Sequence, residues 1–328
     1  MAEEHPSLVL HLGDYLYEGP GARGPRTHAP DAEAVTLADY RLRHAQYRTD
    51  ADLQAAHAIA PWLVVWDDHE LANNYNSETS SAPGQSDFRA RRAAAYQAYY
   101  ENMPLRRRSL PHGDDMRLYR RVRWGRLATF HMLDTRQYRD AEACHKATPD
   151  CTDRTDPLRS ITGAEQQSWL LDGLRSSSSR WDVLGQQVFL AARDFAAGPA
   201  VAHNLNSWDG YVASRDRILH GLRGVANPVV LTGDVHKNYA NNVALDPDDP
   251  DSPTVATELV TTSLTSGGNG VDGGDKAELL LRENPHIKFI NSQRGYVSTR
   301  IGRDRLRADF KVLPYVTAAP RCRRGRAS

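Results

Sequence analysis

Three segments of the chain end an apolar, strand-like run in side chains that bind metal ions. They are LVLHLGDYLY (residues 8–17), WLVVWDDHE (62–70) and PVVLTGDVH (228–236). Each places Asp together with His or Tyr where a buried strand ends at the edge of a sheet, the usual position of ligand sites in α/β proteins. Carboxylates, a phenol and imidazoles at three such places favour one assembled metal centre over three unrelated surface loops.

In the first segment, Asp14 is the first carboxylate after the strand, and Tyr17 can return its phenol to the same side. A phenolate suits a ferric ion, because a hard trivalent cation favours an anionic oxygen donor. Taken alone, Asp14 is more often a turn former and Tyr17 a packing residue. Their assignment as ligands therefore depends on the other two segments.

The second segment offers Asp67, Asp68 and His69 in a row. Adjacent residues at a strand end point in opposite directions, so one aspartate is expected to face the metal, and we assign Asp68. His69 would then contact a substrate phosphate or protonate a leaving oxygen, a task that suits its near-neutral titration. Asn73 or Asn74 could add an amide ligand. The alternative, an exposed acidic turn, leaves the apolar WLVVW before it unexplained.

In the third segment, Asp234 and His236 are two residues apart, so in an extended backbone both side chains face the same way and form a ligand pair. Arg136, after another strand-like run, has the planar fork that suits phosphate, although a surface ion pair explains it equally well. The loop NSWDGY (206–211) supplies Trp208 and Asp209, which either line a substrate pocket or cap a core.

The elements that must position these residues form a mixed pattern. We predict helices over 35–58, over 86–103, after a Thr162–Glu165 capping box, and over 213–223. Strands are expected at the three segments above, in a hairpin over 117–136, over 181–190, and through most of the last third of the chain. Such an order predicts an α/β or α+β sandwich rather than a regular doubly wound fold.

Composition excludes several classes of function. Lysine plus arginine equals aspartate plus glutamate at 41 each, so no overall field attracts nucleic acid, and no basic stripe carries interleaved aromatics. No apolar run approaches the length of a membrane span, and residues 1–7 lack the features of a signal peptide. Cys144 and Cys151 could close a small loop in an oxidising compartment or remain free thiols.

The ordered motifs HLGDYLYEG, WDDHELANN, LDTRQY, NSWDGY, LTGDVH and RGYVSTRI resemble the PhoD-like alkaline phosphatase and phosphodiesterase family. The resemblance spans roughly residues 3–316. This family belongs with the calcineurin-like metallophosphatases, and its core is similar to that of the purple acid phosphatases. The fold that it implies is a sandwich of two mixed β-sheets flanked by helices, as a single catalytic domain over residues 1–328.

The resemblance also implies cofactors and roles. Ferric iron and calcium would be held by Asp14 bridging the metals, Tyr17 on iron, Asp68 and Asn74 on the calcium side, and Asp234 with His236. Hydroxide activated by the metals would attack a phosphate mono- or diester while His69 and Arg136 steady the substrate, and Trp208 and Asp209 would contact it. Lipid or teichoic-acid-like diesters are an alternative substrate class.

The beginning of the chain and its basic tail, APRCRRGRAS, depart from the family pattern. Members normally have, before the GDY motif, a signal sequence, an N-terminal β domain and a strand with an iron-binding cysteine, none of which precedes GDY here. We therefore expect an N-terminally truncated domain without its first core strand, and a disordered tail over 317–328. A fragment that cannot hold its metals is the alternative to an active enzyme. The family's export implies a secreted, periplasmic or cell-wall location, and the oligomeric state is open.

Overall fold

The computed structural model describes residues 1–21, 27–77, 79, 87–144, 151–274 and 276–318. Its strands form one seven-stranded sheet, in the order β3-β4-β5-β6-β8-β7-β9, and two two-stranded sheets, β1-β2 and β10-β11. The strands are β1 (Val9–His11), β2 (Trp62–Val64), β3 (Arg120–Trp124), β4 (Ala128–Met132), β5 (Trp181–Gln186), β6 (Pro228–Thr232), β7 (Asn238–Ala244), β8 (Thr254–Val260), β9 (Ile287–Asn291), β10 (Gly295–Ile301) and β11 (Leu306–Val312).

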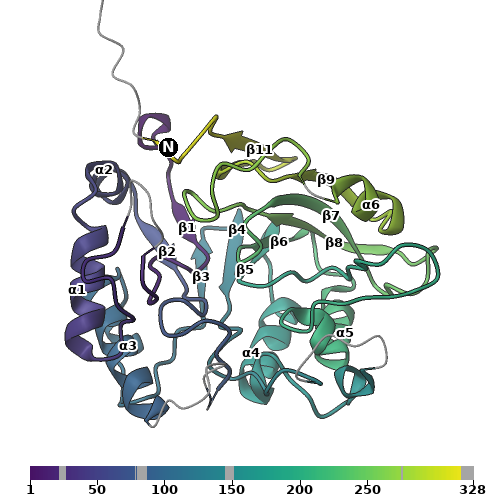
Figure 1. The fold of residues 1–328 in the computed structure, drawn as a ribbon. Helices are drawn as coiled ribbons and strands as arrows, with labels where there is room; N and C mark the ends of the chain where they lie inside the picture. Colours follow the sequence, from purple (N-terminus) through teal and green to yellow (C-terminus); the bar gives the residue numbers. More distant parts are fainter. Residues whose placement is uncertain (22–26, 78, 80–86, 145–150, 275, 319–328) are drawn as a thin grey trace, which may run out of the picture.

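Helices cover the sheets from several sides (Figure 1). They are α1 (Leu37–Tyr47), α2 (Ala51–Ile59), α3 (Phe88–Asn102), α4 (Gly163–Arg175), α5 (Val212–Leu222) and α6 (Ala277–Glu283). In Figure 1, α1, α2 and α3 lie beside β1 and β2, whereas α4 and α5 lie together below the large sheet and α6 lies next to β9. No helix in the described part of the chain is both long enough and apolar enough to cross a membrane.

Parallel pairing brings the ends of several strands to common edges. β1 pairs in parallel with β2, and β4, β5, β6 and β8 form a parallel series. Strands that run the same way end at the same edge, and the loops beyond those ends therefore gather there. The loops after β1, β2, β4 and β6 carry the predicted metal ligands with His69 and Arg136, the segment after β5 carries Trp208 and Asp209, and the loop after β8 joins them.

The interior contains two large apolar clusters. One includes Val9 and Leu16 of the β1 region with Val64, Trp66 and Tyr96. The other is built on the large sheet and on the inner faces of α4 and α5. The loops after β1 and β2 leave the first cluster, whereas β4 and β6 contribute residues to both clusters, so the loops after these strands gather where the two clusters meet.

The mixed α/β fold and the 117–136 hairpin agree with the sequence predictions, but two local expectations were wrong. The helix expected over 35–58 is two helices, because the Asp50 side chain accepts hydrogen bonds from the backbone N–H of Asp52 and Leu53 and so starts α2. Thr162 is the N-cap of α4 but makes no side-chain cap bond, and Glu165 instead accepts from Tyr119.

The question left open by the cysteines is answered by a disulfide between Cys144 and Cys151. The expected disordered tail falls almost wholly on residues 319–328, which lie outside the described residues, as does Cys322. Val316, just before it, is buried.

Candidate metal centre

The loops after β1 and β2 meet because of a glycine. Gly13 has φ +114°, and an added Cβ would lie 2.4 Å from the Cβ of Asp67. Only glycine permits this approach in this backbone conformation. Below it, Glu70 accepts hydrogen bonds from the backbone N–H groups of Asp14, Tyr15 and Asp67. The Asp14 and Asp67 segments are therefore fixed to each other before any ligand is considered.

The predicted ligands of all three segments converge. One ligand atom each of Asp14, Asp68 and His69 lie within 4.8 Å of one another, and the same holds for Asp67, Asp68 and Asp234.

Tyr17 links the segments across the site. Its hydroxyl lies 3.1 Å from Asp14 Oδ2 and 2.9 Å from His236 Nε2, and it also lies 3.1 Å from Ser266 Oγ. His236 and Asp234 remain about a third and a quarter exposed, at 33% and 25% of their side chains. The cluster is thus buried at its base and open to solvent on the side of β6.

Arg136 lies beneath the carboxylates. Its side chain is 0% exposed, and it contacts Asp67 through Nε at 2.5 Å and Nη2 at 3.2 Å, and Asp234 through Nη2 at 3.1 Å. Nη1 donates to Asn206 Oδ1. Its full burial excludes the surface ion pair that was one of the two alternatives from the sequence. The guanidinium is a buried counter-charge for the acidic cluster.

Four of the residues proposed as ligands have left-handed backbones. The φ angles are +54° for Asp14, +51° for Asn74, +61° for Asp234 and +54° for His236. Residues other than glycine adopt this conformation at an energetic cost, and such strain gathers at functional sites where the surrounding structure fixes it. Because of this backbone, Asp234 and His236 are not an extended pair, although they reach the same cluster.

His69 is held by a residue that the sequence analysis did not select. Its Nδ1 lies 2.7 Å from Glu18 Oε2, and its ring packs on Tyr17 with centroids 4.2 Å apart. Glu18 is 5% exposed and also accepts from the backbone N–H of Asn73. Burial lowers the pKa of His69, but the bond to Glu18 and the charge of Asp68 outweigh it and raise that pKa to about 9. The ring is therefore protonated at neutral pH.

The electrostatics of the cluster fit a cation. Burial, with the charges of Asp68 and Asp234, raises the pKa of Asp14, and burial raises that of Asp67 despite Arg136. Burial and the charge of Asp14 raise the pKa of Glu70 to about 8. Asp14 Oδ1 is buried and has no hydrogen-bond partner among the described residues. One guanidinium does not neutralise this much carboxylate, and hard oxygen donors of this kind suit hard metal ions.

Not every predicted site residue joins the cluster. Asn74 is exposed, and it is its backbone N–H that contacts Asp68 Oδ2, at 2.6 Å. Trp208 and Asp209 are each 1% exposed: the indole donates to Gln186, and the carboxylate pairs with Arg215. This placement fits the core-capping alternative. From the same loop, Asn206 contacts Arg136 instead.

Three residues in or around the cluster were missed for different reasons. Asp67 was set aside because strand alternation was assumed to continue beyond β2, which ends at Val64. Glu18 comes four residues after Asp14 and could have been noticed as a further carboxylate. Ser266 follows β8 in a serine- and glycine-rich loop with no metal-binding pattern, and only the strand order reveals it.

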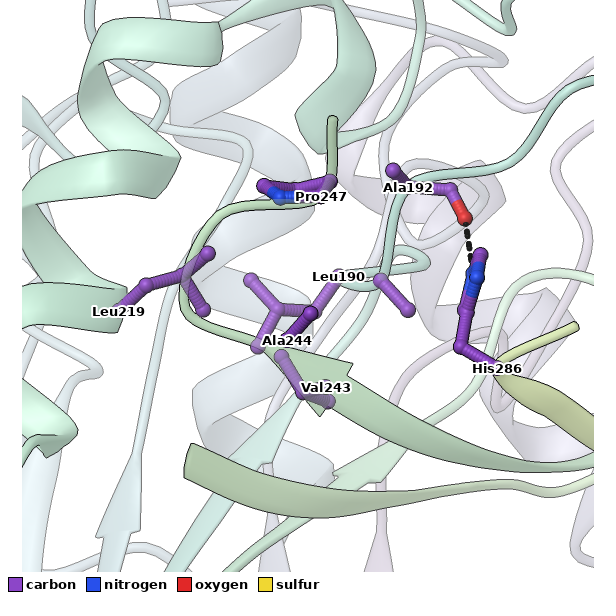
Figure 2. Close-up of a pocket in the computed structure, with 8 residues that line it drawn as sticks. Leu190, Ala192, Leu219, Val243, Ala244, Pro247 and His286 are labelled. Carbon is purple, nitrogen blue, oxygen red and sulfur yellow. Dashed lines mark hydrogen bonds between the residues drawn. The ribbon is translucent and has the colours of Figure 1, made fainter. Parts of the chain in front are cut away.

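Cavities elsewhere do not compete with this site. A cavity of about 10 Å³ lies between Leu190, Leu219, Val243 and Ala244. His286 lies at its edge, and its Nε2 donates to the backbone oxygen of Ala192 at 2.7 Å (Figure 2). This space is at most the size of one water molecule. An open groove of about 550 Å³ lies between the ends of α4 and α5, at the opposite end of β5 and β6 from the carboxylates.

Comparisons with known proteins agree with the geometry. A family model described as PhoD-like phosphatase matches residues 1–310. Alkaline phosphatase D of Bacillus subtilis (strain 168) is 48% identical, over 97% of this chain and 56% of its own length. A solved structure entitled "Structure of PhoD" superposes with a TM-score of 0.94 at 46% identity, over 98% of this chain and 63% of that one. The chain thus spans somewhat more than half the length of these relatives.

Proposed function

The chain belongs to the PhoD-like phosphatase family, and from this premise we propose that it hydrolyses phosphate esters at the cluster of Asp14, Asp68 and Asp234. The observation that carries the proposal is the convergence of carboxylates from three strand ends on one partly open site. The relatives include an alkaline phosphatase by name, which supports the same reaction class.

We propose that ferric iron and calcium occupy this cluster. Tyr17 and His236, whose hydroxyl and Nε2 lie 2.9 Å apart, would hold iron together with Asp14. Asp68 and Asp234 would hold calcium, and Asp67 is a further candidate because its carboxylate lies within the same group. The exposed amide of Asn74 would join them by turning toward Asp68, which its backbone N–H already contacts. Such ions polarise the phosphoryl oxygens and activate water.

The side chains of the protein would divide the remaining work. Attack of water on phosphorus breaks the ester P–O bond, and the leaving oxygen needs a proton. His69 is suited to donate it, because the Glu18 carboxylate lies 2.7 Å from its Nδ1, fixes the ring and favours its protonated form. Arg136, being fully buried, would hold the carboxylates in place and contact no substrate.

The substrate is proposed to be a phosphate mono- or diester, as expected from the family resemblance. A secreted, periplasmic or cell-wall location is supported by the disulfide between Cys144 and Cys151, since disulfides persist in oxidising environments.

Metal analysis combined with turnover tests the proposal. The purified chain is analysed for iron and calcium by mass spectrometry, and hydrolysis of an aryl phosphate monoester and of a diester is measured with and without added calcium. Asp234→Asn should lose metal and turnover together, since it removes one carboxylate from the cluster. Asp172→Asn, in an exposed ion pair with Arg175, is the matched control.

Bound iron with calcium-stimulated hydrolysis would support the proposal, and the ratio of diester to monoester turnover would identify the preferred class. A wild-type chain that binds neither metal and hydrolyses neither ester would contradict it. Normal turnover by Asp234→Asn would contradict the placement of the site.

A further inference from the structure

Arg294 begins the segment RGYVSTRI (294–301), for which the proposed reaction has no role so far. It lies between β9 and β10 and is 5% exposed. Its Nε donates to Gly268 O at 2.8 Å, Nη1 to Thr262 Oγ1 at 3.0 Å, and Nη2 to Gly267 O at 3.2 Å. Nη1 also donates to the backbone oxygen of His236.

All four acceptors of Arg294 are neutral. Within the described part of the chain, no carboxylate forms an ion pair with this guanidinium. A buried arginine usually pairs with a carboxylate, because the loss of hydration is otherwise uncompensated. Burying a guanidinium without a carboxylate partner costs stability, so the positions of its four acceptors indicate what the residue does.

The acceptors belong to two separate parts of the site. His236 follows β6, whereas Thr262, Gly267 and Gly268 lie in the loop after β8. That loop touches the centre directly, since Ser266 Oγ is 3.1 Å from the Tyr17 hydroxyl.

Glycine at position 267 is required by this contact. Its φ is +82°, and an added Cβ would lie 3.2 Å from Arg294 Nη2 and 3.5 Å from His236 Nδ1. The loop backbone therefore packs against both the His236 ring and the guanidinium, with little room for a side chain.

We propose that Arg294 is a positioning residue of the metal centre, which fastens the loop 262–269 to the backbone of His236 and so fixes the His236 imidazole. The planar fork of arginine directs five donors from three nitrogens and so reaches all four acceptors at once, whereas a lysine ammonium has three donors on a single nitrogen. His236 has a left-handed backbone, φ +54°, so its orientation depends on such outside support. The inference rests on the proposed function in that His236 is taken as a metal ligand.

Metal affinity and loop exchange test the role together. Arg294→Ala and Arg294→Lys should each bind metal about 10- to 100-fold more weakly, the usual effect of removing a group that orients a ligand. Affinity is measured by calcium and iron titration followed by mass spectrometry after dialysis. In metal-free protein, hydrogen exchange should speed up in peptides covering 262–269, and this second measurement does not depend on metal or turnover.

Arg120 provides a matched control. It also donates to two backbone oxygens, of Leu118 at 3.0 Å and Val64 at 2.8 Å, and it lies on β3 outside the cluster. Arg120→Ala should lower stability yet leave metal affinity and the exchange of 262–269 unchanged. Millimolar guanidinium should restore metal retention to Arg294→Ala, because the vacated space keeps its acceptors, whereas equimolar potassium chloride should not.

Unchanged exchange of 262–269 in Arg294→Ala would overturn the fastening of the loop. Faster exchange with unchanged metal affinity would overturn the role in positioning His236. If the wild-type chain binds no metal, the positioning role is overturned together with the proposed function. Intact wild-type metal binding with unaffected variants would overturn the positioning role alone.

Discussion

At the scale of single residues, the acidic cluster has more negative charge than its one buried arginine balances. Burial and, after it, the charges of neighbouring carboxylates raise the pKa values of Asp14, Asp67 and Glu70. The sequence predicted the donors because Asp and His after apolar runs form a local pattern. It could not predict the buried place of Arg136, because its partner Asp67 is 69 residues away and burial is a property of the fold.

Asp14→Asn should stabilise the metal-free protein while it weakens metal binding. The substitution removes one carboxylate from the cluster, and asparagine tolerates the left-handed φ of +54°. Thermal unfolding in the presence of a chelator is expected to give a higher Tm than the wild type, and metal titration a lower affinity. Asp172→Asn should change neither the Tm nor the metal affinity. A lower Tm for Asp14→Asn would show that the negative charge of the cluster is already compensated without metal.

Arg136→Met should destabilise the metal-free protein by about 3–5 kcal/mol, the cost of leaving buried carboxylates without their partner. Urea unfolding measures this free energy. If Arg136 only contacted substrate, its replacement would change KM and leave unfolding unaffected. Normal stability of Arg136→Met would therefore favour the substrate contact expected from the sequence. Arg175→Met, which breaks an exposed pair with Asp172, is the control and should have little effect.

At the scale of elements, strand order decides which loops form the site. Periodicity located most helices and strands, but no local pattern tells that β8 lies between β6 and β7 in the sheet. The loop after β8 therefore could not be assigned to the site from the sequence. Capping was also misjudged: α1, not α4, has a capping box, between Thr36 and Asp39. Thr162, like Thr36, is a threonine at an N-cap, but its hydroxyl is buried and makes no hydrogen bond to the first turn of α4.

Glu258 of β8 joins several elements at the centre of the sheet. It is 0% exposed and accepts from the N–H groups of Leu190 and Ala191, from Thr232 Oγ1 and from Asn241 Nδ2.

Glu258→Ala should cost about 3 kcal/mol or more, because several buried donors lose their acceptor. Urea unfolding of this variant is compared with Glu278→Ala, at an exposed position of α6, which should differ little from the wild type. Equal stability of the two variants would mean that water replaces the carboxylate at no cost.

A group of histidines between α1, α2 and β1 should make the protein sensitive to acid. Burial lowers the pKa of His44 to about 3 and that of His11 to about 4. The unfolded chain binds protons on these histidines near pH 6.5, whereas the folded chain does not, so their contribution to stability should fall as pH drops below about 6.5 and level off near pH 3. The raised pKa values of Glu70 and His69 act in the opposite direction, so the effect of the histidines is measured as a difference between variants.

His44→Phe keeps an aromatic ring against Tyr15 and Tyr99 and removes one such group. Between pH 6 and 4, its free energy of unfolding should depend less steeply on pH, by about 1.4 kcal/mol per pH unit. Urea unfolding at several pH values measures the slope. His112→Asn, at an exposed turn, is the control. An unchanged slope in His44→Phe would mean that the folded protein protonates His44 as readily as the unfolded chain.

At the scale of the whole molecule, the site joins two cores. Asp14, Tyr17 and Asp68 extend from the cluster around β1 and β2, whereas Asp234 and His236 extend from the large sheet. Contacts such as that of Tyr17 with His236 cross between them. A metal ion bound here would tie the two halves together and would not bind the unfolded chain in the same way.

Metal should therefore raise the Tm of the entire protein. At a hundredfold excess over Kd, binding stabilises by about 2.7 kcal/mol, which corresponds to roughly 5 °C for a chain of this size. Calorimetry with calcium and iron, or with a chelator, measures the shift. Asp234→Asn should show none, and a shift of equal size in that variant would place the stabilising ion elsewhere.

The buried guanidinium of Arg136 also bears on whether the chain folds before or after it binds metal. Because it contacts Asp67 and Asp234 as soon as the loops after β2, β4 and β6 come together, the acidic cluster has a cation from the moment the chain closes. Folding and metal loading can then be separate steps, the first dependent on the polypeptide alone and the second on supply. Scarcity of metal would delay metal loading without preventing the chain from folding.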